Sequence, residues 1–134
     1  MTKSRDGYWN CGVLGTIPNQ SFAVQVLSGA SIMVGMAFTS NFQPDGTNYN
    51  RCGYYIYLST GTLYSQEGHN GTPYFNRRVE NGSVIRVEWD SEERTISYRI
   101  DNQSYGVAYR VTVPGDLFPA VEMYYAVDSV TFVD

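Results

Sequence analysis

The sequence predicts an all-β fold, an antiparallel sandwich of about ten short strands. Apolar residues recur at every second position along most of the 134 residues, as they do on the half-buried face of a strand. No stretch longer than one or two turns has the helical period of about 3.6 residues. Turns rich in Gly, Asn, Asp and Ser separate the apolar runs at intervals of roughly 8–12 residues, which is typical of sandwiches and barrels.

The first half of the chain contains four of the expected strands. Residues 22–27 alternate between apolar and other side chains, and in residues 32–38 every second side chain is a large apolar one. A turn near Gly29 separates these two strands. Residues 54–58 are expected to form the third strand and residues 62–64 the fourth.

The clearest alternation lies in residues 85–89, where Ile, Val and Trp share one face and Arg and Glu share the other. This pattern places Trp89 in the core. Residues 90–94 are the polar connection of a hairpin, after which the chain returns and Arg99 is expected to face Glu88 across the ladder. The remaining strands are expected over residues 96–100, 105–113, 117–123 and 127–133.

No linker, repeat or shift in composition divides the chain. Residues 1–134 are therefore expected to form one domain, with residues 1–21 as an N-terminal strand or lead-in. The longest irregular stretches are residues 41–53 and 65–76. Since β-scaffolds usually carry their functional residues on loops, these two stretches are the first candidates for a site.

The charge balance and the apolar runs count against several classes of partner. Nine Lys and Arg residues against thirteen Asp and Glu residues give a net charge of −4, whereas a nucleic-acid binder needs a basic surface. No apolar run approaches the roughly 20 residues of a membrane span, and the first residues lead into no apolar signal core. We expect no nucleic-acid or membrane partner and an intracellular location, cytoplasmic or nuclear. Cys11 and Cys52 are then expected to stay reduced.

The sequence offers no catalytic or metal-binding pattern. His69 is the only histidine, and no Gly-x-Ser-x-Gly elbow occurs with it. Cys11, Cys52 and His69 lack the paired spacing of zinc ligands, and acidic residues such as Asp45 are too scattered for a calcium loop. No phosphate-cradling glycine motif is present. We expect no enzyme activity, no catalytic residue, no metal and no cofactor.

Six short motifs follow one another along the chain. They are Val34-Gly35-Met36-Ala37, Gly61-Thr62-Leu63-Tyr64, the strand opened by Gly82-Ser83 and ended by Trp89-Asp90, the run from Thr95-Ile96-Ser97-Tyr98 through Asp101-Asn102 to Gly106-Val107-Ala108-Tyr109, Leu117-Phe118-Pro119-Ala120-Val121, and Ser129-Val130-Thr131-Phe132. In this order and with these gaps, they resemble the SPRY domain family over about residues 22–133.

The resemblance implies a bent antiparallel β-sandwich of the concanavalin-like, jelly-roll type, with Trp89, Phe118 and Phe132 in its core. It also implies a protein-interaction module whose loops at one end grip a partner protein, usually through a short peptide. SPRY domains occur in ubiquitin ligases, their substrate receptors, calcium-release channels and scaffolds. The chain therefore resembles a monomeric recognition or adaptor domain of a larger protein or complex. Residues 7–15 do not resemble the PRY segment that precedes many relatives, so it resembles a SPRY-only module.

The same resemblance indicates where a partner would bind. Tyr124 and Tyr125 follow the strand at which relatives carry a bulky contact residue, and Tyr64 matches a contact position of the substrate-receptor branch. Thr39 and Asn41 are expected to leave the Val-Gly-Met-Ala strand toward the same end. The other candidates for partner binding come from the two long loops and are Tyr49, Asn50, Arg51, Tyr74, Arg77 and Arg78. Tyr and Arg are enriched at binding hot spots.

Two other interpretations remain open at this stage. Tyr and Trp platforms also stack on sugars, so a carbohydrate-binding, lectin-like sandwich is the alternative; it would usually need a calcium loop, for which residues 41–50 with Asp45 are the candidate. The third interpretation is a purely structural domain of a larger assembly, in which the tyrosines simply cover half-buried strand faces.

Overall fold

The computed structural model describes residues 11–29, 31–43, 46–125 and 128–133, with only the backbone of Cys11 and Val13. Eleven strands lie in these described residues. They are β1 (Cys11–Leu14), β2 (Phe22–Ser28), β3 (Ile32–Ala37), β4 (Gly53–Tyr57), β5 (Thr62–Ser65), β6 (Asn70–Pro73), β7 (Val84–Asp90), β8 (Thr95–Ile100), β9 (Gln103–Arg110), β10 (Phe118–Met123) and β11 (Ser129–Val133). None of the described residues forms a helix that could cross a membrane.

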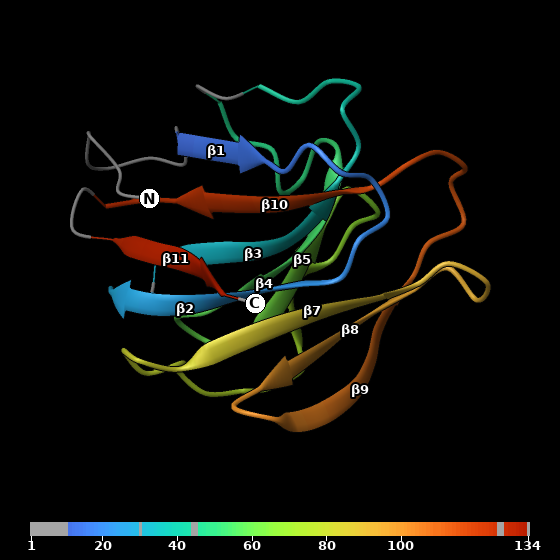
Figure 1. The fold of residues 1–134 in the computed structure, drawn as a ribbon. Coiled ribbons are helices and arrows are strands. Elements are labelled where there is room, and N and C mark those ends of the chain that lie inside the picture. The colour runs from blue at the N-terminus through green and yellow to red at the C-terminus, as the bar shows by residue number, and fades with distance from the viewer. Residues whose placement is uncertain (1–10, 30, 44–45, 126–127, 134) are drawn as a thin grey trace.

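The strands form two antiparallel sheets that pack face to face (Figure 1). The six-stranded sheet has the order β1-β10-β3-β4-β5-β6, and the five-stranded sheet has the order β11-β2-β7-β8-β9. The predicted all-β antiparallel sandwich is confirmed. Sequential strands β3, β4, β5 and β6 are neighbours, as are β7, β8 and β9. The connections β4–β5, β5–β6, β7–β8 and β8–β9 are short, whereas β3 and β4 are joined by the long segment of residues 38–52.

The core lies between the two sheets, and the period-two alternation of the strands fills it. Val24 from β2 and Val87 from β7 meet Val34 from β3 and Ile56 from β4 in one apolar cluster, and all four are fully buried. Trp89 is 9% exposed and belongs to the same cluster. Its predicted place in the core is confirmed.

The six-stranded sheet is also covered on its outer face, away from the five-stranded sheet. Every residue of β3 is buried, although only alternate residues can point between the sheets. Met33 and Ala37 point the other way and pack with Tyr55 of β4 and Ala120 of β10 in a second cluster. This outer cluster underlies the candidate site.

Details of three strands differ from the prediction. β6 lies in a stretch expected to be a loop, because an exposed edge strand of Asn, Gly, Thr and Pro shows no apolar alternation. Arg99 lies directly opposite Arg86, and Glu88 lies opposite Ser97. The expected Arg99–Glu88 interaction is therefore diagonal, with Nε and Oε1 3.7 Å apart.

Phe132 is not a core residue, contrary to the expectation from the resemblance. Its side chain is 49% exposed, because β11 is the edge strand of its sheet. Among the described residues its ring meets that of Phe22, with centroids 6.1 Å apart. Phe118 is only partly buried. The predicted hairpin connection after Asp90 is confirmed, since Asp90 Oδ1 accepts hydrogen bonds from the backbone N–H groups of Glu92 and Glu93.

Candidate functional site

The segment between β3 and β4 folds back over the outer face of the six-stranded sheet. Its base is closed by the Phe38 N–H, which donates to the Cys52 carbonyl at 2.8 Å. Phe42 and Tyr49 from this segment pack on the outer cluster around Tyr55. The segment therefore adds a layer above the sheet and carries exposed residues on top of it.

Asn48 organises this segment from within. Its side-chain amide donates to the carbonyls of Gln43 at 2.7 Å and Gly46 at 3.2 Å, and its side-chain oxygen accepts from the Gln43 N–H at 2.7 Å. Its own carbonyl accepts from the N–H groups of Arg51 and Cys52. The fully buried Asn48 thus provides hydrogen-bond partners for backbone groups of a segment that is not paired in a sheet.

Glu122 of β10 anchors Asn48 to the sheet. The Asn48 N–H donates to Glu122 Oε1 at 2.7 Å, and Glu122 is fully buried. Burial raises the pKa of Glu122 to about 7, although hydrogen bonds from Asn48 and Tyr49 and the charge of Arg51 act to lower it. Glu122 Oε2 and the Tyr55 hydroxyl, both buried, have no hydrogen-bond partner among the described residues.

The raised pKa of Glu122 makes stability pH-dependent. Because the folded state holds the proton up to about pH 7 and the unfolded state releases it near the ordinary value, Glu122 destabilises the fold as pH rises through this window. Glu122→Gln keeps the Oε1 acceptor and removes the charge. We expect the difference in the free energy of unfolding, variant minus wild type, to be about 2–3 kcal/mol larger at pH 8 than at pH 5. Urea unfolding of both proteins at the two pH values measures it.

The matched control for this prediction is Glu93→Gln, which lies in the exposed β7–β8 turn and should change the free energy of unfolding by less than about 0.5 kcal/mol at either pH. A difference between Glu122→Gln and wild type that stays constant from pH 5 to pH 8 would show that Glu122 does not titrate in this range.

A tyrosine-lined cleft of about 240 Å³ opens beside this anchored segment. We call it the tyrosine cleft; its lining residues are Ser31, Met33, Tyr49, Tyr57, Tyr64, Tyr124 and Tyr125. The ring of Tyr64 meets Tyr49 and Tyr57 edge to face, with centroids 5.5 Å and 5.9 Å apart. These contacts hold three rings in fixed relative orientations.

The rim of the tyrosine cleft is a tight turn held by Asp128. Asp128 Oδ2 accepts from the N–H of Tyr125 at 2.7 Å and from that of Tyr124 at 3.3 Å. The Tyr124 N–H also donates to the Ser31 carbonyl at 3.0 Å. Tyr125 projects from this turn and remains 45% exposed, so a large aromatic surface stands free on a rigid support.

The sequence model of the SPRY domain matches residues 20–133. The chain belongs to the SPRY domain family. The crystal structure of the SPRY domain of human HERC1 superposes with a TM-score of 0.76 at 16% identity, covering 92% of this chain and 81% of that chain. The crystal structure of a human SPRY domain gives a TM-score of 0.73 at 17% identity, covering 90% and 82%. These structures share the fold. No curated protein sequence is similar enough to count as a match.

Four of the residues predicted to bind a partner meet in the tyrosine cleft of this SPRY domain: Tyr49, Tyr64, Tyr124 and Tyr125. Asn50 lies next to them, in a shallower depression that also includes Tyr49 and His69. Sequence reasoning missed Ser31, Met33 and Tyr57. A signal for Tyr57 was present, since it alternates with Tyr55 and therefore points to the same face of β4.

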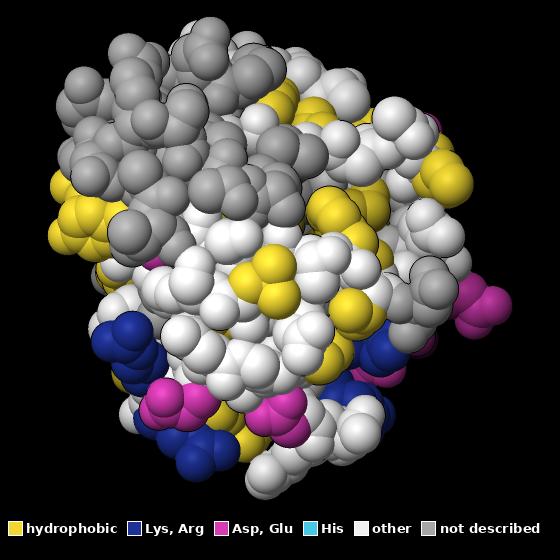
Figure 2. All heavy atoms as spheres, turned by 60° about the vertical axis from the view of Figure 1, so that its left-hand side comes forward, with side chains coloured by type: hydrophobic (Ala, Val, Ile, Leu, Met, Phe, Trp, Pro, Cys, Tyr) yellow, Lys and Arg dark blue, Asp and Glu magenta, His cyan; other side chains and the backbone are white. Residues whose placement is uncertain are grey.

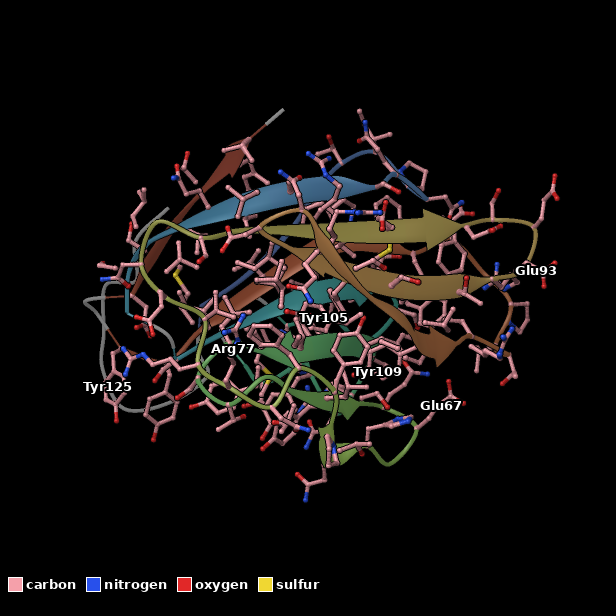
Figure 3. All side chains as sticks on the ribbon, turned by 90° about the horizontal axis from the view of Figure 1, so that it is seen from below. Glu67, Arg77, Glu93, Tyr105, Tyr109 and Tyr125 are labelled. Atoms are coloured by element: carbon pink, nitrogen blue, oxygen red, sulfur yellow. The ribbon has the colours of Figure 1, made fainter. Side chains whose placement is uncertain are left out.

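Thr39 and Asn41 do not lie at the same end as Tyr124 and Tyr125, so this expectation is wrong. Tyr124 is bonded to Ser31, just before β3, whereas Thr39 follows the other end of that strand. Thr39, Asn41 and Arg51 line a different cavity, which also includes Gln66. Figure 3 shows Tyr125 and Glu67, the neighbour of Gln66, at opposite ends of the sandwich.

The three remaining candidates lie apart from both places. The Tyr74 hydroxyl donates to the Gly106 carbonyl at 2.6 Å, which ties the chain after β6 to β9. The Arg77 guanidinium lies over the Phe75 ring, 4.5 Å from its centroid, and Arg77 and Arg78 line a further depression that also includes Asp101. On the face in Figure 2, basic and acidic side chains lie close together along the lower margin. This margin is therefore neither a purely basic nor a purely acidic patch.

The only histidine of this SPRY domain has structural contacts. His69 Nδ1 lies 2.6 Å from Ser65 Oγ, within the turn between β5 and β6, and its ring packs against Tyr109. Among the described residues, no three His, Cys, Asp or Glu side chains are placed to hold a metal ion. Cys52 is a free, buried thiol whose pKa burial raises to about 11. The side chain of Cys11 and the whole of Asp45 lie outside the described residues.

Proposed function

We propose that this SPRY domain recognises a short peptide or an exposed loop of a partner protein in the tyrosine cleft. SPRY domains are generally protein-interaction modules, and the proposal assigns this role to one surface of the chain. In this proposal the domain works inside the cell as the recognition or adaptor part of a larger protein. Recognising the substrate of a ubiquitin ligase is one such role.

The observation that carries the proposal is the convergence of tyrosines from four separate segments around one opening. Tyrosine offers a large rigid surface with a hydrogen-bonding tip at a low cost in side-chain entropy. The rings are held by each other and by the Asp128 turn before any ligand arrives. Such pre-organisation lowers the cost of binding.

The proposal predicts that the exposed aromatic rings contribute most of the affinity. A partner is first isolated by affinity capture with the wild-type domain and mass spectrometry. Tyr125→Ala and Tyr64→Ala are each expected to weaken its binding by about 2 kcal/mol or more, roughly 30-fold, in titration calorimetry.

Phe132→Ala is the matched control, because Phe132 is an aromatic residue of similar exposure on the edge strand β11. It is expected to leave the affinity unchanged. All three variants should still fold and melt cooperatively, and Tyr64→Ala should lose the most stability, because its ring packs on Tyr49 and Tyr57. Unchanged affinity in folded Tyr125→Ala and Tyr64→Ala would place the site elsewhere.

A further inference from the structure

A second and larger cavity, of about 560 Å³, lies at the opposite end of β3 from the tyrosine cleft. We call it the end cavity. Three parts of the chain surround it: residues 38–41 with Arg51 and Cys52 from the β3–β4 segment, Gln66 after β5, and residues 113–116 with Phe118 at the start of β10. The proposed function makes no use of this cavity.

The walls of the end cavity are held in place by the domain itself. Arg94 Nη2 donates to the carbonyls of Val113 at 2.8 Å and Gly115 at 3.2 Å. Asn19 Nδ2 donates to Asp116 Oδ1 at 2.9 Å. A Cβ added at Gly115 would meet the ring of Phe38 at 3.4 Å, so the segment rests on that ring. The cavity is therefore a formed feature of the fold and not a gap between free loops.

One part of the wall offers apolar surface to a ligand. Val113 is 37% exposed and Pro114 is also exposed, although both are apolar. The half-buried rings of Phe38 and Phe118 line the same cavity. A large apolar side chain placed here would remove apolar surface from water on several sides.

Among the described residues, the Gln66 side-chain oxygen has no hydrogen-bond donor and the Arg51 guanidinium has no ion-pair partner. Gln66 Oε1 is buried and accepts no hydrogen bond from any described residue, whereas the Gln66 backbone is fixed by its N–H donating to the Gly53 carbonyl at 2.8 Å. The Arg51 side chain is exposed and forms no ion pair with a described residue. The cavity thus presents apolar surface beside one exposed cation, Arg51, which favours an anionic group on the ligand.

From this combination we infer that the end cavity is a second docking site, which binds an extended peptide carrying a large apolar side chain next to an aspartate or glutamate. The apolar side chain packs against Val113, Pro114 and the two Phe rings. The carboxylate pairs with Arg51. Asp116 also lines the cavity, and Asn19 Nδ2 donates to one of its two carboxylate oxygens.

The test uses a phage-displayed library of random linear peptides, selected on the wild-type domain and on the variants Arg51→Ser, Val113→Ser and Tyr125→Ala. Each replaced side chain is partly or fully exposed, so thermal melting should confirm that the variants fold. We expect wild type and Tyr125→Ala to share one group of enriched peptides, which carry an acidic residue beside an aromatic or large aliphatic one. Binding of a synthetic copy should fall at least about tenfold in Arg51→Ser and in Val113→Ser.

A second readout locates the bound peptide directly. In ¹⁵N-labelled protein, the synthetic peptide should shift the side-chain amide signals of Gln66 and the backbone signals of residues 113–117, and leave those of Tyr124 and Tyr125 in place. If every enriched peptide depends on Tyr125 and none depends on Arg51 or Val113, the inference is overturned and the tyrosine cleft is supported. Enrichment of basic peptides would also overturn the inference. So would a selection in which no enriched peptide binds more weakly to Arg51→Ser or Val113→Ser.

Discussion

Gly35→Ala is expected to prevent the domain from folding. Gly35 lies opposite Tyr55 in the β3–β4 ladder. A Cβ at this position would fall on the Tyr54 carbonyl oxygen and 2.8 Å from both the Tyr54 carbonyl carbon and the Tyr55 Cα. All three are backbone atoms in the centre of the six-stranded sheet, so the strands would have to part. We expect a loss of at least about 5 kcal/mol, comparable with the whole stability of a small domain.

Circular dichroism and thermal denaturation of purified Gly35→Ala would test this expectation. Gly68→Ala is the control: its φ is +96°, but nothing lies within 4 Å of the added Cβ. That variant should lose only about 1–2 kcal/mol, from backbone strain alone. A Gly35→Ala protein that melts like Gly68→Ala would mean that β3 and β4 do not approach as closely as the structure has them.

Trp89→Ala is expected to destabilise the domain by about 3–5 kcal/mol. Trp89 fills the inner face of β7 in the main core, and the Arg94 guanidinium lies over its ring at 5.2 Å from the centroid. Alanine would leave a cavity among buried side chains and remove this cation–π contact. Chemical denaturation of the variant measures the loss.

Phe132→Ala again serves as the comparison, because it removes an aromatic ring that is about half exposed. It should cost about 1 kcal/mol or less. Trp89→Phe should lose less than half as much stability as Trp89→Ala, since Phe restores most of the buried volume. Equal midpoints for Trp89→Ala and Phe132→Ala would contradict the burial of Trp89.

Alternation predicted the strands well where one face is buried and the other is exposed. The hairpin of β7 and β8 is the clearest case, because charged residues mark its outer face. β3 is buried on both faces, so its sequence shows that it is a strand but not which side faces the other sheet. The exact opposition of Arg99 was missed because register in this hairpin depends on the β7–β8 turn, where Arg94 has a positive φ.

The tyrosine cleft was predicted in part because its residues lie near recognisable motifs. The error over Thr39 and Asn41 has a topological cause. β3 and β10 are antiparallel neighbours, so residues that follow the end of one strand and residues that follow the end of the other must lie at opposite ends of the sheet. The burial of Glu122 was not predictable from its neighbours in sequence, because a segment some seventy residues earlier covers it.

The Asn48–Glu122 anchor separates the residues that hold the β3–β4 segment from those that face solvent. The anchor joins Asn48 of the segment to Glu122 of the sheet. Asn50 and Arg51 are exposed, and Arg51 contributes a backbone N–H to the Asn48 carbonyl and a charge that acts on Glu122. Substitutions at these two positions can therefore accumulate without loss of the scaffold, and selection can act on their contacts alone. The same division makes positions 50 and 51 suitable for randomisation in a library that seeks new ligands on an unchanged domain.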